Sequence, residues 1–221
     1  MSGLGNASIN KLVATRTLDS IINCILLCIK KMQTDCLGGN KMIPNNELNI
    51  RDYLFFNYLN DDDVMKEIGF TDIWFFAEAP VNYIDNIPKG RADLQIFSFN
   101  YFKSRQEYFI VECKRIDGTK TLNRKYIDEG IRRFVGDSPL YTSFCNTNGL
   151  LGFVVKNIDI TVNANIINEL LRTDYLDINT YSYLHKDTGK RVFSSSHKLR
   201  TAEKVELKHA FFDISSIVST H

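Results

Sequence analysis

The chain has 221 residues, of which 44% are hydrophobic and 24% charged, and its formal net charge is +1. This balance is typical of one globular domain with a full-sized core, and it excludes a disordered chain. The five cysteines are an odd number, without the paired spacing of a disulfide framework or the nearby histidine of a zinc site. We therefore expect free thiols in a reducing compartment, the cytoplasm.

The apolar spacing of residues 9–32 predicts one long helix or two short ones, in which Cys24 and Cys28 are packed thiols. Its most apolar run, residues 21–29, is far shorter than the roughly 20 residues that span a bilayer. Polar residues between positions 10 and 19 break the pattern of a signal peptide. These features predict a protein without a membrane segment.

A loop at residues 37–41 separates this region from a second predicted helix. That helix begins after Pro44, with Asn45 or Asn46 as its N-cap, and the polar run at residues 60–63 either ends it or starts a short helix that reaches Ile68. Residues 73–78 then predict a first strand, and residues 82–90 a turn-rich loop.

Two further strands, residues 90–97 and 108–116, are joined by a short polar connection. A helix at 121–134, a buried strand at 150–157 and a helix at 164–172 follow, and the last forty residues are again typical of strands. With no internal repeat or linker, the sequence predicts a single α/β domain over residues 1–221. We divide it into a helical extension (1–40), a core (45–156) and a C-terminal helix with strands (157–221).

Charge is unevenly distributed along this nearly neutral chain. Residues 44–85 hold nine acidic and two basic residues, whereas residues 114–133 and 186–208 each hold seven basic and three acidic ones. The two basic segments predict surfaces for a polyanion that border one cleft. The alternative is that they form ordinary solvated faces.

Polar and apolar residues alternate in both strands of the predicted hairpin, so Asp93 shares a strand face with Arg91, and Glu112 shares one with Lys114. A hairpin centred between residues 102 and 103 places Asp93 opposite Glu112, and Lys114 opposite Arg91. Paired side chains have Cβ atoms about 5 Å apart. Two carboxylates at that distance can share one Mg²⁺ or Mn²⁺ ion.

Such a site suits phosphodiester hydrolysis. A hard cation held by one or two carboxylates keeps open positions for a phosphate oxygen and an attacking water. Lys114 then orients or helps to deprotonate the water, or offsets charge in the transition state. The alternative for these residues is a strand end with cross-strand ion pairs, each worth under about 1 kcal/mol.

Asp93 followed by Glu112-Cys113-Lys114 at the end of an apolar strand resembles the Asp…(Asp/Glu)-x-Lys signature of the PD-(D/E)xK nuclease superfamily. The resemblance covers residues 45–156 and implies a restriction-endonuclease-like core, a mixed sheet flanked by helices. It implies that Asp93, Glu112 and the Cys113 carbonyl are metal ligands and that Lys114 is the catalytic lysine. The pair Arg91-Ala92 departs from the family, in which many members have a proline before the aspartate.

In this family a carboxylate on the preceding helix often joins the metal site. Glu47 is the best match, with Glu78 as the alternative, although Glu47 also suits a favourable charge in the first turn of a helix.

The function that the resemblance implies is a Mg²⁺-dependent deoxyribonuclease, in bacterial defence or a related process, that acts alone, as a homodimer or with a partner protein. The alternatives are an RNA-cleaving enzyme and a nucleic-acid-binding or assembly module with the same fold but no turnover. The expected nucleic-acid contacts are Arg91, Arg115, Arg133, His197 and Arg200.

Overall fold

A computed structural model describes residues 3–84, 87–98, 108–136, 139–141, 146–187, 192–201 and 203–219, and among these it describes the side chains of all but residues 3–10, 82–84 and 87–89. The helices are α1 (Gly3–Gly38), α2 (Glu47–Leu54), the π-helical turn η1 (Phe55–Leu59), α3 (Asp62–Glu67), α4 (Lys120–Tyr126), the π-helical turn η2 (Ile127–Ile131), α5 (Arg132–Phe134) and α6 (Ile160–Thr173). The strands are β1 (Ile73–Ile84), β2 (Ile87–Ser98), β3 (Phe109–Ile116), β4 (Thr147–Val154), β5 (Thr180–Lys186), β6 (Val192–Lys198) and β7 (Lys204–Asp213).

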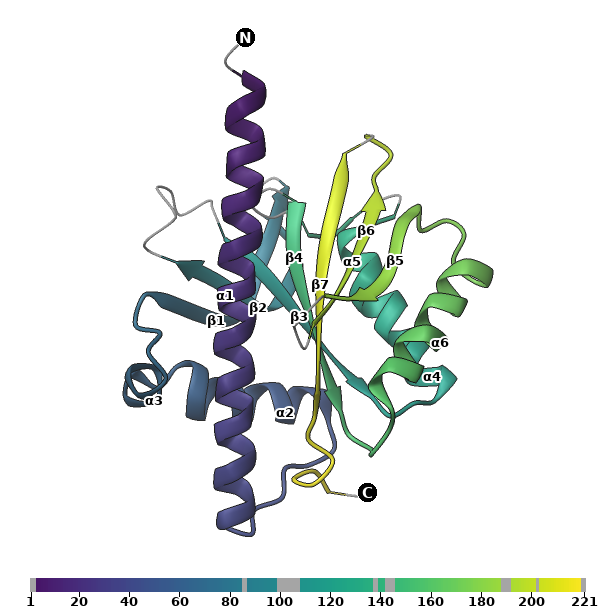
Figure 1. Cartoon of the computed structure of the whole chain (residues 1–221). Helices are drawn as coiled ribbons and strands as arrows, with labels where there is room; N and C mark the ends of the chain where they lie inside the picture. Colours follow the sequence, from purple (N-terminus) through teal and green to yellow (C-terminus); the bar gives the residue numbers. More distant parts are fainter. Residues whose placement is uncertain are drawn as a thin grey trace.

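The seven strands form one mixed, open sheet in the order β1-β2-β3-β4-β7-β6-β5 (Figure 1). Strands β1, β2 and β3 are antiparallel, β3, β4 and β7 are parallel, and β6 and β5 complete the sheet with antiparallel pairs. The chain therefore has the predicted α/β class. Strands β5 and β1 lie at opposite edges of the sheet.

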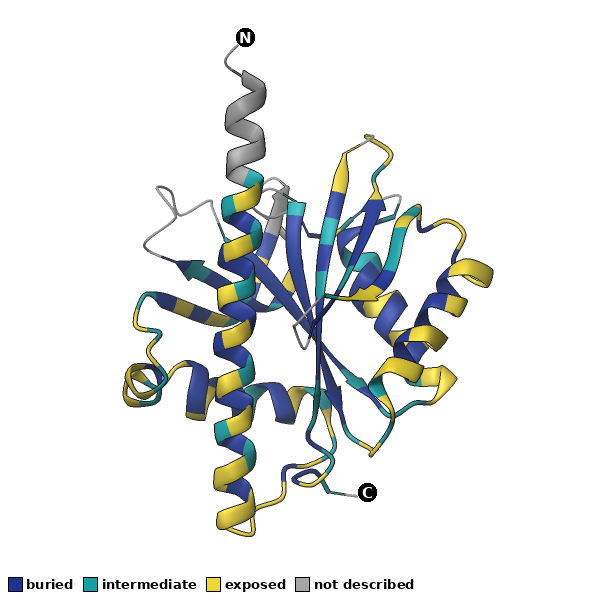
Figure 2. Ribbon diagram, in the orientation of Figure 1, coloured by how far each residue is buried: buried dark blue, intermediate teal, exposed yellow. Residues whose placement is uncertain are grey.

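Both faces of the sheet are buried, and Figure 2 shows its central strands in dark blue. Neighbouring residues of β4 point to opposite faces, as the pleat of a strand requires. Leu151 packs in the cluster that contains α1, whereas Leu150 packs with Tyr126 of α4 and Ile167 of α6. Strands β3 and β4 are buried along nearly their whole length, which explains why they are continuously apolar in sequence.

Helix α1 is one long helix, and the expectation that its apolar part is too short to cross a membrane was wrong. Residues Lys11–Gly38 are long and apolar enough by length and composition, although half of their most apolar window is buried within the protein. Leu18, Ile21, Ile25 and Ile29 form one fully buried stripe at helical spacing. Such a stripe is typical of the core helix of a soluble α/β domain.

Two further sequence predictions needed correction. The predicted loop at residues 82–90 is largely strand, since Tyr83 pairs with Pro88 and Val81 with Gly90. Its composition suggests a turn, but strand pairing overrides local preference. Helix α6 also begins earlier than predicted, because the Asp159 side chain accepts hydrogen bonds from the first amides of the helix.

The prediction of free thiols is confirmed for four of the five cysteines. Cys24, Cys28, Cys36 and Cys113 are free and buried. Cys145 lies outside the described residues.

Candidate active site

The N-terminus of α2 delivers two charged side chains to the sheet. Asn46 is the N-cap, and its side chain accepts hydrogen bonds from the amides of Leu48 (3.0 Å) and Asn49 (3.3 Å). The cap fixes Glu47 in the first turn. Arg51 follows four residues later on the same side of the helix. Both side chains contact residues of the sheet.

Strand register places three carboxylates in one row. The predicted pairing of β2 with β3 is confirmed by three pairs, Leu94 with Val111, Gln95 with Ile110, and Ile96 with Phe109. Gln95 also pairs with Phe76 of β1. One pleat further along, on the same face of these three adjacent strands, come the acidic side chains. They are Glu78, Asp93 and Glu112.

The β2–β3 ladder ends where this row begins. Beyond the pair Leu94–Val111, the Asp93 carboxylate accepts the hydrogen bond of the Cys113 amide at 2.8 Å. A side-chain oxygen thus replaces a main-chain acceptor. Glu78 departs from ordinary strand geometry as well, with φ of 52°, and a non-glycine residue in this region carries backbone strain.

The ammonium group of Lys114 joins three of the predicted site residues. Its Nζ atom lies 2.8 Å from Glu47 Oε1, 3.1 Å from Glu112 Oε1 and 3.8 Å from Asp93 Oδ2. It also donates to the Cys113 carbonyl at 2.8 Å. The structure therefore brings together every catalytic and metal-ligating residue proposed from the sequence.

Arg51 forms a second cationic centre in the same site, and no role was predicted for it. Its guanidinium, only 4% exposed, contacts Glu78 and lies 2.8 Å from Asp93 Oδ1. It also bonds to Asp52, at 2.7 Å. The spacing of Arg51 from Glu47 was the available signal, since residues four apart share a helix face.

A pocket of about 330 Å³ contains this cluster. It is lined by Glu47, Leu48, Arg51, Glu78, Arg91, Asp93, Glu112, Lys114, Glu129 and Arg133. Glu47 and Glu78, the two alternatives for an additional carboxylate, therefore both border it. Glu47 lies on the Lys114 side and Glu78 on the Arg51 side.

Glu112 is the most deeply buried carboxylate of the site, with 2% of its side chain exposed. Burial, reinforced by the charge of Asp93, raises the pKa of Glu112 to about 7, against the opposing effect of Lys114 and Arg133. Its Oε2 atom is buried and has no hydrogen-bond partner among the residues that the structure describes. A buried carboxylate oxygen with no donor is costly.

Lys114 is protonated in this environment. Burial lowers the pKa of Lys114, but the charges of Glu112, Asp93 and Glu47 outweigh it and raise that pKa above its ordinary value. A protonated amine donates hydrogen bonds and cannot accept a proton. Lys114 is thus suited to orient a water or a phosphate oxygen, rather than to act as a base.

The donor set of the pocket suits a hard divalent cation. It offers carboxylate oxygens and the Cys113 carbonyl, which are the ligands that Mg²⁺ and Mn²⁺ prefer. Within the described part of the chain, the Oε2 of Glu112 is the one ligand atom among them that is buried without a hydrogen bond. Among the described residues, no three His, Cys, Asp or Glu side chains already form a metal-binding group. Arg51 and Lys114 lie between the carboxylates and supply the positive charge.

Two of the five predicted nucleic-acid contacts, Arg91 and Arg133, line the pocket. Arg133 Nε lies 3.2 Å from Glu112 Oε1, and its Nη1 donates to the Tyr141 hydroxyl at 2.7 Å. That hydroxyl donates to the Arg91 carbonyl at 2.5 Å. Tyr141 was missed, because nothing in its sequence surroundings marks it.

The other three predicted contacts have different positions. Arg115 donates to the carbonyl and side-chain oxygens of Asn45, at 2.6 and 2.8 Å, and so ties β3 to the start of α2. His197 is fully buried, which is incompatible with the surface contact expected of it. Arg200 is exposed in the turn that leads into β7, away from the residues that line the pocket.

The prediction that both basic segments border one cleft was wrong. Of residues 114–133, only Lys114 and Arg133 are among the described basic residues lining the pocket, and residues 186–208 contribute none to that described lining. Lys208 instead pairs with Asp187 at 2.7 Å. Many of the remaining charges are neutralised locally, as with Arg132, which lies 2.5 Å from Asp177.

Comparison with known proteins finds no match among family models, curated proteins or solved structures.

Proposed function

We propose that this chain is a metal-dependent nuclease that hydrolyses phosphodiester bonds, in DNA before RNA, and that it acts in the cytoplasm. One observation carries the proposal. Glu47, Asp93, Glu112 and Lys114 come from a helix and two strands and meet in one pocket. The order of helix, three antiparallel strands, helix and parallel strand supports a restriction-endonuclease-like fold for residues 45–156.

Each residue has a role that its surroundings allow. Asp93, Glu112 and the Cys113 carbonyl would hold Mg²⁺ or Mn²⁺, with Glu47 or Glu78 as a further ligand. When bound, the cation supplies Lewis-acid activation of the phosphate and of a water. Lys114 donates a hydrogen bond to the attacking water or to a phosphate oxygen and stabilises the charge that grows on that oxygen. Arg91 and Arg133 bind neighbouring phosphates.

A non-catalytic binding module is the second candidate, and one observation favours it. Arg51 and Lys114 already pair with the four carboxylates of the site, so each carboxylate has a cationic partner without a bound metal ion. In that case the pocket would bind nucleic acid through Arg91 and Arg133 alone.

The experiment that tests the proposal is incubation with linear, circular and single-stranded DNA and with RNA, each with Mg²⁺, Mn²⁺ or EDTA. Asp93→Ala is expected to abolish cleavage and leave binding equal or tighter, because a negative charge facing the phosphates is removed. Lys114→Ala is expected to lose cleavage too but to keep much of its metal affinity.

Lys120→Ala is the matched control, because this α4 lysine is 65% exposed and pairs only loosely with Asp174, at 3.8 Å. It should cleave like the wild type. If the wild type shows no cation-dependent cleavage of any substrate, and Asp93→Ala and Lys114→Ala behave like it, the binding module replaces the nuclease.

A further inference from the structure

A second, larger pocket opens beside the site. It has a volume of about 860 Å³ and lies between the α2–η1–α3 segment and the edge strand β1. It shares Leu48, Arg51 and Glu78 with the site pocket. The two pockets therefore adjoin at these residues, where Arg51 pairs with Glu78.

The second pocket presents exposed aromatic rings. Phe56, Trp74 and Phe76 line it, and they are 65%, 54% and 45% exposed. We call this pocket, with these three rings, the aromatic groove. Large exposed apolar groups in one place are unusual on a protein surface and mark a binding site.

The register of β1 ties the aromatic groove to the site. Trp74, Phe76 and Glu78 alternate along one face of the strand, so Phe76 lies one pleat, about 7 Å, from the row of carboxylates. Phe97 of β2 is the cross-strand partner of Trp74, and it meets Phe76 edge to face at 5.6 Å and 88°. The Phe76 ring is therefore held in place beside the site.

The charged groups around the groove largely cancel. Asp52 and Glu78 both pair with Arg51, and Lys66 lies 3.5 Å from Asp63. Asp62 is a further exposed acid in the lining. The groove thus offers ring faces and no surplus of positive charge, which favours a flat, uncharged group over a phosphate.

We propose that the aromatic groove binds unpaired bases of a single-stranded nucleic acid whose backbone runs into the site pocket. The inference rests on the proposed function, because it takes a nucleic acid as the substrate. It adds that this substrate is single-stranded. Bases stack on aromatic side chains with little dependence on sequence. A duplex buries its base faces in its own stack, so it cannot offer them to Phe76 and Trp74.

The sole tryptophan of the chain is Trp74, so its fluorescence reports directly on the groove. The measurement is made in EDTA, where no cleavage occurs, with an oligothymidylate of about 12 nucleotides, an abasic strand of the same length and a duplex. The oligothymidylate is expected to change Trp74 fluorescence and to bind most tightly. The abasic strand carries the same phosphates and should bind weakly without that change.

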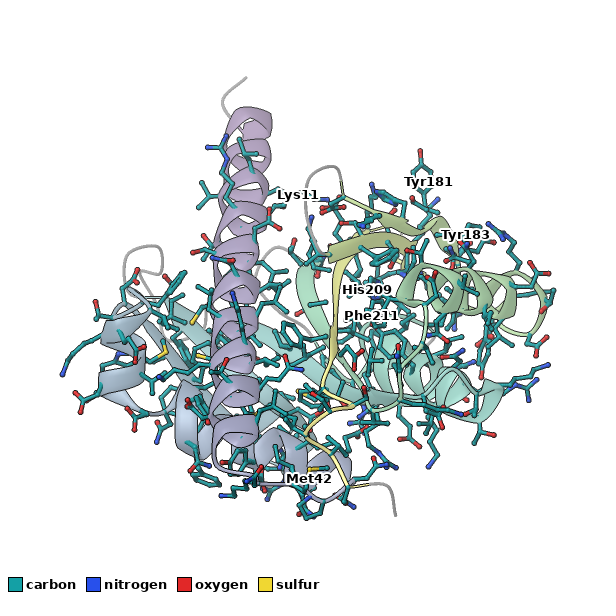
Figure 3. All side chains as sticks on the ribbon, turned by 60° about the horizontal axis from the view of Figure 1, so that its bottom comes forward. Lys11, Met42, Tyr181, Tyr183, His209 and Phe211 are labelled. Carbon is teal, nitrogen blue, oxygen red and sulfur yellow. The ribbon has the colours of Figure 1, made fainter. Side chains whose placement is uncertain are left out.

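Phe76→Leu removes the π-face but keeps the apolar area, which also preserves the fold. It is expected to weaken oligothymidylate binding about fivefold or more. The dependence of binding on salt should stay unchanged, because no phosphate contact is lost. Tyr181→Leu is the matched control, since Tyr181 is 76% exposed on β5, at the opposite side of the molecule (Figure 3).

Equal binding of the abasic strand, preference for the duplex, or an unchanged affinity of Phe76→Leu would each overturn the inference. Self-association of the wild type that Phe76→Leu abolishes would assign the groove to a second copy of the chain. Cleavage assays with Mg²⁺ run in parallel separate the two proposals. Base-dependent binding without cleavage contradicts only the nuclease, whereas cleavage without base-dependent binding contradicts only the groove.

Discussion

Glu112→Gln tests whether the buried carboxylate of Glu112 lowers the stability of the folded protein. Glutamine keeps the shape of the side chain and removes its charge. Glu112 is 2% exposed, and no described residue forms a hydrogen bond with its Oε2 atom. Because burial and Asp93 raise its pKa from 4.5 to about 7, the ionised form is less favourable in the folded protein than in the unfolded chain.

The sign and size of the effect follow from that pKa. A raised pKa in the folded state contributes stability that is complete below 4.5 and is lost as the pH rises through about 7. Each unit of pKa difference is worth about 1.4 kcal/mol, so the full cost is about 3 kcal/mol. Glu112→Gln is therefore expected to be more stable than the wild type by about 1–3 kcal/mol at about pH 8, and nearly equal to it at about pH 4.

Urea denaturation of both proteins at the two pH values measures this difference. Glu169→Gln is the control, since Glu169 of α6 is 66% exposed and should show no such dependence on pH. Mg²⁺ should raise the stability of the wild type at about pH 8 and have less effect on Glu112→Gln. If Glu112→Gln is destabilised equally at both pH values, Glu112 acts as a structural partner of Lys114, and the reasoning fails.

Two further predictions concern β6 and the packing between β4 and β7. Burial lowers the pKa of His197 to about 4. The stability that the neutral His197 contributes is therefore lost as the pH falls from about 6.5 to about 4. The difference in urea midpoint between the wild type and His197→Gln should narrow over that pH range. Gly152→Ala is expected to cost about 1–3 kcal/mol in thermal denaturation, because its Cβ would lie 2.4 Å from Cδ1 of Phe211. If the thermal stability of Gly152→Ala equals that of the wild type, the Phe211 ring moves freely away from the added methyl group.

The sequence predicted the centre of the site well because strand pairing has a period of two. Alternation in β2 and β3, with a hairpin centre, fixed the row that contains Asp93 and Glu112, and the pairs around Gln95 confirm that register. The sequence could not predict that Arg51 belongs to the site. Arg51 and Asp93 are 42 residues apart, and their contact depends on how α2 is placed against the sheet.

The histidines show the opposite outcome. His197 lies in a strand near several lysines and was expected to contact nucleic acid, yet it is buried because β6 pairs on both sides. His209 is buried as well, on β7 (Figure 3). Local charge suggested a surface, but the burial of a strand depends on its place in the sheet, which neighbouring residues do not encode.

These histidines belong to a chain of hydrogen bonds whose direction can be deduced. Thr180 donates to a main-chain carbonyl at 3.2 Å, so it accepts from His197 Nδ1 at 3.2 Å. His197 Nε2 then accepts from Ser195 (2.9 Å), which accepts from His209 Nε2 (2.8 Å). His209 Nδ1 in turn accepts from Tyr126 (2.8 Å). Both rings are neutral, and each has one definite tautomer.

The two buried polar clusters differ in a way that bears on function. In the histidine chain each of these buried ring nitrogens has a partner, and such a network stabilises one packing of α4 on the sheet. The carboxylate cluster instead keeps a Glu112 oxygen that has no partner in the described ranges, and Glu78 has φ of 52°. Buried ion pairs contribute little to stability compared with apolar packing, so a cluster that is also incomplete and strained is poorly explained by folding alone. Perturbed carboxylates in a pocket are typical of functional sites, and this contrast between the two clusters is why the nuclease proposal is placed at Glu112 rather than at the histidines.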